Sequence, residues 1–190
     1  MLWSGLHRTC ISHFNHNKEF IYKARGFENI SQMNEAIIEN INDRVTYEGD
    51  LWILGDLCLG TDIEGNKQLI ERINCPNIHI IYGNHDTDTR KAMYNTCWNV
   101  IDGYYAYQQK WNGFHFYLSH FPTITSNLEK ESLRQCTCCL YGHTHQISNF
   151  YLEYPMIYHV GVDSHNLCPV SINKIIYDME AKAKECRDYL

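Results

Sequence analysis

Four short apolar runs, each followed by a polar side chain able to bind a metal ion, constrain this sequence more than any other feature. They occupy residues 51–56, 78–86, 114–120 and 139–145. Runs of this length predict buried β-strands. Functional groups in open sheets gather just beyond the carboxyl ends of strands, so the Asp, Asn and His side chains that follow these runs are expected to converge. Such a convergence favours a metal centre.

Outside these four runs, the sequence predicts mainly helices in its first half and mainly strands in its second half. Helices are predicted over residues 28–45, with Asn29 or Ser31 as the cap, and over residues 69–73, 88–97 and 171–189. Further extended segments are predicted over residues 104–107, 137–141, 150–154 and 156–162. This order predicts the α/β class, with two mixed sheets covered by helices.

No linker divides the 190 residues, so we expect a single domain over residues 1–190. Residues 1–12 form an atypical start, because Arg8 interrupts the first apolar run. The charged tail, from about residue 181 to residue 190, is expected to fray.

Charge and composition argue against several classes of protein. The net charge is −6 and no dense Lys/Arg run occurs, so a nucleic-acid partner is not expected, although it is not excluded. No apolar stretch is long enough to span a membrane, and no membrane partner is expected. His7 and Arg8 stand where a secretory signal needs an apolar core, so the nine cysteines are expected to be reduced and the protein cytoplasmic.

The motifs, taken in order, resemble the calcineurin-like metallophosphoesterase superfamily, in particular its small bacterial and phage type. The matching motifs are Gly55-Asp56, Gly83-Asn84-His85-Asp86, His120 and Gly142-His143-Thr144-His145. The segments His13-Phe14-Asn15-His16 and Arg25-Gly26-Phe27 resemble the opening of that group, and Gly161-Val162-Asp163-Ser164-His165-Asn166 resembles its ending. The resemblance covers nearly the whole chain and implies a four-layer α/β/β/α sandwich of two mixed sheets flanked by helices.

The resemblance also implies a centre for two divalent metal ions. The implied ligands are His13, Asp56, Asn84, His120, His143 and His145. Asp56 would bridge both ions, since a carboxylate has two oxygens and a full negative charge. The mixed nitrogen and oxygen ligands suit Mn, Fe, Co, Ni or Zn better than Ca or Mg, and we expect one or two ions per chain, most readily Mn.

Four other residues are implied to act on the substrate. His85 would be the catalytic acid or transition-state stabiliser, and Asp86 would orient it. The alternative is that this pair only stabilises a turn. His16 and Arg25 would contact the substrate phosphate.

The first motif of that superfamily, Asp-x-His, is broken here. If His13 is its histidine, Ile11 stands in the place of the aspartate. A second register, with Gly5 and His7, also lacks it. Isoleucine cannot bind a cation, so we expect a mononuclear or weakly dinuclear centre with reduced activity. An error in the sequence of residues 1–12 is the alternative explanation.

The predicted function is therefore that of an enzyme, a metallophosphoesterase. It would hydrolyse a small phosphate mono- or diester by attack of a metal-activated hydroxide. The alternative is a non-catalytic module on the same fold that binds a phosphate ligand or a protein partner.

Overall fold

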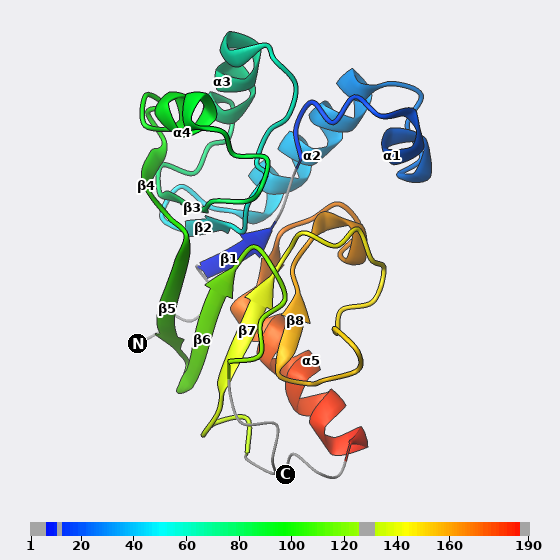
Figure 1. The fold of residues 1–190 in the computed structure, drawn as a ribbon, viewed down its shortest axis with the longest axis vertical. Coiled ribbons are helices and arrows are strands. Elements are labelled where there is room, and N and C mark those ends of the chain that lie inside the picture. The colour runs from blue at the N-terminus through cyan, green and yellow to red at the C-terminus, as the bar shows by residue number, and fades with distance from the viewer. Residues whose placement is uncertain (1–6, 11–12, 126–131, 187–190) are drawn as a thin grey trace.

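The four apolar runs become strands of two different sheets in the computed structural model, which describes residues 7–10, 13–125 and 132–186 (Figure 1). Two of them, β2 (Asp50–Ile53) and β3 (Ile78–Ile81), belong to a five-stranded sheet. The other two, β6 (Phe114–Ser119) and β7 (Thr137–Tyr141), belong to a four-stranded sheet.

The first sheet has the order β4-β3-β2-β1-β9. Its other strands are β1 (His7–Cys10), β4 (Val100–Tyr104) and β9 (Val170–Ser171). Strands β1 to β4 are parallel, and β9 pairs antiparallel with β1. The central strands are buried on both faces, which explains their nearly continuous apolar sequence.

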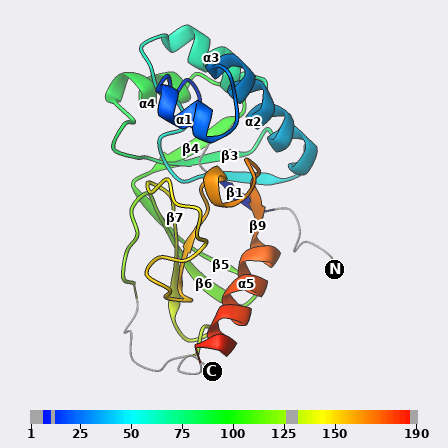
Figure 2. The same ribbon diagram turned by 90° about the vertical axis from the view of Figure 1, so that its right-hand side faces the viewer.

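The helices α1 to α4 lie on the side of the first sheet that faces away from the second sheet (Figures 1 and 2). They are α1 (Glu19–Ala24), α2 (Ile30–Arg44), α3 (Ile63–Glu71) and α4 (Asp88–Tyr94). The predicted helix over residues 28–45 is confirmed as α2, and the Asn29 side chain caps it by accepting a hydrogen bond from the Gln32 amide. Alternate residues of β2 divide between two cores, because Leu51 packs toward α2 and Trp52 toward the second sheet.

The second sheet has the order β5-β6-β7-β8, completed by β5 (Ala106–Trp111) and β8 (Ile157–His159). Strands β6, β7 and β8 are parallel, whereas β5 is antiparallel to β6. The last helix, α5 (Ile172–Glu185), adds Ile175 and Met179 to the core shared with Leu118 and Leu140. The predicted α/β class, with two mixed sheets flanked by helices, is confirmed.

Two predicted segments differ from the structure. Helix α5 continues through Glu185 instead of fraying from residue 181, because Ala183 is fully buried in the core; residues 187–190 lie outside the described part. The segment 150–154 is a turn, in which Leu152 and Glu153 have positive φ angles of 48° and 64°. In the described part of the chain, no helix is both long and apolar enough to cross a membrane.

Candidate metal centre

The predicted ligands lie just beyond the carboxyl ends of parallel strands. Asp56 follows β2 and Asn84 follows β3 in the first sheet, while His120 follows β6 and both His143 and His145 follow β7 in the second. The loops that leave the two sheets meet, and they bring these side chains together as the strand pattern predicts.

Two glycines allow the loops to approach so closely. A Cβ atom on Gly55 would lie 2.1 Å from Nδ1 of His120, and one on Gly83 would lie 2.2 Å from Oδ1 of Asp56. Both distances are well below van der Waals contact, so any other residue would displace a candidate ligand. Close packing against the ligands therefore explains why Gly55 and Gly83 precede Asp56 and Asn84 in these motifs.

His120 is the centre of the first group of ligand atoms. Its Nε2 lies 3.2 Å from Oδ2 of Asp56, 3.0 Å from Oδ1 of Asn84 and 3.1 Å from Nδ1 of His143. Its Nδ1 lies 2.9 Å from the carbonyl oxygen of Leu54. A carbonyl only accepts hydrogen bonds, so Nδ1 carries the proton and Nε2 of the neutral ring presents a lone pair.

Lone pairs that face one another at this distance need a positive charge between them. Ligand atoms held about 2.1 Å from a common ion are roughly 3.0–3.4 Å apart in octahedral or tetrahedral geometry. The contacts around His120 Nε2 fall within this range. Burial lowers the pKa of His120, but hydrogen bonds to Asp56 and to the Leu54 carbonyl and the charge of Asp56 raise it above its usual value, so that without a metal ion a proton on Nε2 can supply this positive charge.

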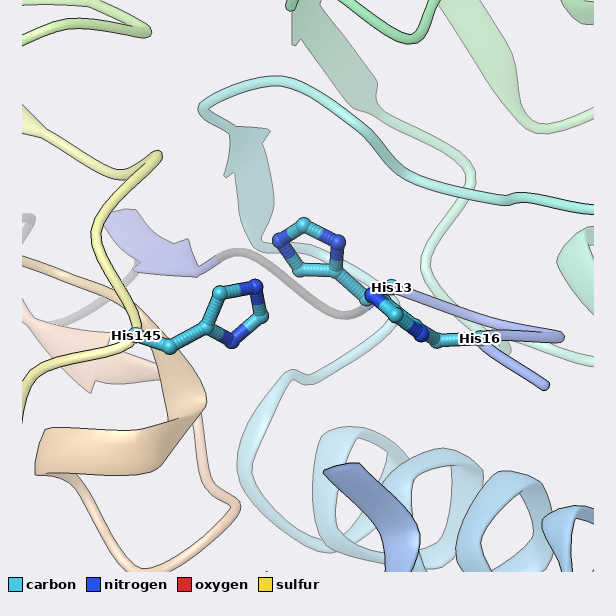
Figure 3. Close-up of side chains that lie close together, drawn as sticks. All are labelled: His13, His16 and His145. Atoms are coloured by element: carbon cyan, nitrogen blue, oxygen red, sulfur yellow. The ribbon is translucent and has the colours of Figure 1, made fainter. Parts of the chain in front are cut away.

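A second group consists of three imidazoles, His13, His16 and His145, which face a common space (Figure 3). Each offers a ring nitrogen within 4.8 Å of the others. The Nδ1 atoms of His13 and His16 are buried and lack a hydrogen-bond partner. Burial and the neighbouring His145 ring lower the pKa of both His13 and His16. Neutral rings with unsatisfied buried nitrogens are suited to bind a metal ion.

Asp163 and Arg25 hold the third ring of this group. Nδ1 of His145 lies 2.9 Å from Oδ2 of Asp163, and Arg25 donates to both Asp163 oxygens at 2.7 and 2.9 Å. Burial raises the pKa of Asp163, but hydrogen bonds from His145 and Arg25 outweigh it and hold this pKa well below its usual range. The carboxylate fixes the proton on Nδ1 and leaves Nε2 of His145 for a metal ion.

Asp56 links the two groups electrostatically. Burial raises its pKa, but the hydrogen bond with His120 and the charges of His120 and His13 bring the pKa below its usual value. In the other direction, the charge of Asp56 partly offsets the lowering of the pKa of His13 by burial. The carboxylate therefore acts electrostatically on one histidine of each group, while its oxygens lie within ligand distance of the group of His120 and His143.

Asp86 has a different role from the predicted one. Its Oδ1 accepts a hydrogen bond from the Tyr94 hydroxyl at 2.6 Å, and its Oδ2 accepts from the amides of Gly83 and Asp56 at 2.7 and 2.9 Å. Among the described contacts, these donors engage both oxygens, so Asp86 fixes the two ligand loops rather than the ring of His85. The His85 side chain is exposed, and its amide donates to Oδ1 of Asp56.

Replacing Asp86 by alanine is therefore expected to lower the free energy of unfolding of the metal-free protein by at least about 3 kcal/mol. Two amides and a buried hydroxyl would lose their acceptor together, at about 1–3 kcal/mol for each buried donor. Urea unfolding measures the effect, and Asp88→Ala is the control, because Asp88 is fully exposed two residues away. Equal stabilities of the two variants would contradict this role.

The first motif can be placed only in part. His7 lies at the amino end of β1, where its Nδ1 is 2.9 Å from Oδ2 of Asp50, whereas His13 follows the carboxyl end. The register that uses His13 is thus the one that reaches the centre. Ile11 lies outside the described residues. Arg25, predicted to contact the phosphate, instead has its side chain only 4% exposed and bound to Asp163.

Asp163 has no predicted role, although it lies in the segment that resembles the superfamily's ending. Its position between Arg25 and His145 depends on contacts across 138 and 18 residues of the chain. A partly buried carboxylate beside a predicted ligand is a signal that only the fold supplies.

Comparisons with other proteins agree with this architecture. No model of a protein family matches the chain. The crystal structure of the protein of unknown function AQ665 from Aquifex aeolicus is similar, with a TM-score of 0.66 over 90% of this chain and 97% of that one, at 19% identity. The uncharacterized protein MJ1445 of Methanocaldococcus jannaschii is 31% identical over 172 residues, which are 87% of this chain and 85% of the relative. With this identity over most of both sequences, the chain belongs to the family of MJ1445.

Proposed function

We propose that the protein is a metal-dependent phosphoesterase that hydrolyses a small phosphate mono- or diester. The observation that carries this proposal is the presence of two groups of side chains able to bind a metal ion, His13–His16–His145 and Asp56–His120–His143, which interact electrostatically through His13 and Asp56. Two such groups side by side would hold a pair of divalent ions, which supply an arrangement used for displacement at phosphorus.

Each ion has a full set of donors in this assignment. Asn84, His120 and His143 would hold one ion together with Asp56. His13, His16 and His145 would hold the other. We assign His16 to the ion rather than to the phosphate, because its buried Nδ1 has no other partner. The donors are nitrogen and oxygen atoms, which favours Mn, Fe, Co, Ni or Zn, and we propose Mn first.

When bound, the two ions would neutralise the phosphate and lower the pKa of a water molecule. The protein supplies the remaining parts. Asp163 holds His145 in one tautomer, and Asp86 fixes the loops that carry Asp56 and Asn84. His85, exposed on the loop after β3, would deliver a proton to the leaving oxygen of the ester.

A non-catalytic module that binds a phosphate ligand or a protein partner is the second candidate, since Ile11 replaces the expected aspartate. The place of His16 beside His13 and His145 weakens this alternative, because it supplies a further donor to the same site. We further propose a cytoplasmic location. No disulfide joins the nine cysteines, all of which are in the described part, and eight of them are buried, as suits a reducing compartment.

The test begins with protein stripped of metal by a chelator and reloaded with Mn²⁺ or Zn²⁺. Hydrolysis of bis(p-nitrophenyl) phosphate and of p-nitrophenyl phosphate is expected from the loaded protein and not from the stripped protein. Metal binding with no turnover of either ester, across the ions Mn, Fe, Co, Ni and Zn, would instead support the non-catalytic module.

A further inference from the structure

A pocket of about 710 Å³ opens beside the three-histidine group. His145 belongs to both, because its ring lines the pocket and also faces His13 and His16. The polar end of the pocket consists of His145, Asp163 and Arg25. The pocket is therefore the neighbouring space for the organic part of a molecule whose phosphate lies at the metal centre.

The remaining wall of the pocket is mainly apolar. Phe20 and Ile21 contribute from α1, Ile147 from the loop after β7, and Leu167 from the segment after the short helix η1 (Val162–Ser164). Phe20 is 71% exposed and Ile147 is 86% exposed. Two large apolar side chains that remain in solvent on separate segments around one pocket are typical of a ligand site.

The charges at the polar end are already compensated. Arg25 donates to both oxygens of Asp163, and its side chain is only 4% exposed. The guanidinium is thus engaged and shielded, and it is poorly placed to receive a second anion. An uncharged occupant suits this wall better than a phosphate, which would find its positive charge at the metal ions instead.

We propose that this pocket binds the organic group of the substrate, and that the preferred esters carry an apolar, uncharged group, such as an aromatic ring, close to the phosphate. This inference rests on the proposed function, since it assumes that the phosphate occupies the metal centre. Phe20 and Ile147 then act as specificity residues that contact the organic group.

Binding of non-hydrolysable phosphonates tests the pocket without relying on turnover. We expect the Zn-loaded protein to bind benzylphosphonate at least about tenfold more tightly than methylphosphonate in isothermal titration calorimetry, because only the benzyl group buries apolar surface in the pocket. Phe20→Ala and Ile147→Ala should each reduce this preference about threefold or more. Both residues are exposed, so folding is expected to be unaffected.

Two matched variants serve as controls. Tyr177→Ala on α5 and Ile101→Ala on β4 remove apolar side chains that are 68% and 54% exposed and do not line the pocket. They should leave the preference for benzylphosphonate unchanged.

Equal affinities for the two phosphonates, no binding of either, or a preference that survives both pocket variants would overturn the inference. A failure of the pocket inference can be distinguished from a failure of the proposed phosphoesterase function. A benzyl preference without hydrolysis of any ester would contradict the phosphoesterase alone. Hydrolysis of aryl and methyl esters with equal kcat/KM would contradict the pocket assignment alone.

Discussion

We expect the replacement of Asp56 by asparagine to lower the rate of phosphate-ester hydrolysis more than about 100-fold. Loss of a group that merely orients a metal ligand costs about 10–100-fold, and Asp56 is the proposed ligand of both ions. An amide is neutral and offers one oxygen instead of two, so it cannot bridge two cations as a carboxylate does. The measurement is kcat/KM for bis(p-nitrophenyl) phosphate with Mn²⁺.

Asparagine is a better test than alanine, because Asp56 has a φ angle of +52°. Asparagine tolerates this left-handed conformation, whereas alanine would add backbone strain and could lose activity through misfolding. The asparagine Oδ1 can also keep the hydrogen bond from the His85 amide, which is 2.8 Å in the native protein. A loss of activity in a stable Asp56→Asn variant would therefore reflect the metal centre.

The matched control is Asp102→Asn. Asp102 also pairs with a histidine, since its Oδ1 lies 2.7 Å from Nδ1 of His79, but it lies on β4 away from both groups of ligands. The activity and metal content of the Asp102→Asn variant should equal those of the native protein. An Asp56→Asn variant that bound two ions per chain and kept more than a tenth of the native rate would refute the shared-ligand role.

The strands were predictable because their apolar pattern is local. Each of the four runs is buried along most of its length, so its sequence records burial directly. Helix α1 was not predicted, because it is six residues long with one buried residue, Ile21, and has no apolar stripe. The segment 150–154 has strand-like composition, but positive φ angles at Leu152 and Glu153 turn the chain there. Composition does not carry that information.

The ligands were predictable for a related reason. A motif that follows a strand is carried to the edge of the sheet, so the adjacent strands β2 and β3 bring Asp56 and Asn84 to one edge. His120 follows β6 of the second sheet and reaches them because the loops of the two sheets meet. The contacts that hold the ligands in place were not predictable. They join residues that are separated in the sequence, and no sequence pattern marks them as partners. Two examples are the ion pair of Arg25 with Asp163 and the hydrogen bond that the Tyr94 hydroxyl donates to Asp86.

The role of His16 is the point at which the structure differs most from the ligand set predicted from the sequence. The absence of an aspartate at position 11 predicts a weak first site with ligands only from His13, Asp56 and His145. The structure adds a third imidazole nitrogen within 4.8 Å of those of His13 and His145. A fourth protein donor would compensate for the missing carboxylate in number, although not in charge.

Replacing His16 by alanine is accordingly expected to weaken binding of one of two Zn²⁺ ions by about 10–100-fold, while the other ion keeps its affinity. Calorimetric titration of the stripped protein resolves the two affinities without any need for turnover. His115→Ala is the control, because His115 is an exposed histidine within β6 and belongs to neither group. It should bind both ions as the native protein does.

The two possible roles of His16 predict opposite results in the same experiment. If His16 contacts only the phosphate, His16→Ala would keep both metal affinities and raise KM for the ester. If His16 binds the ion, affinity for the metal falls before any substrate is added. The double variant Ile11→Asp/His16→Ala extends the test, since a carboxylate at position 11 would restore the pattern of the resembled motif. Recovery of the lost affinity in the double variant is expected if His16 stands in for that aspartate, and unchanged affinity in His16→Ala alone would end the proposal.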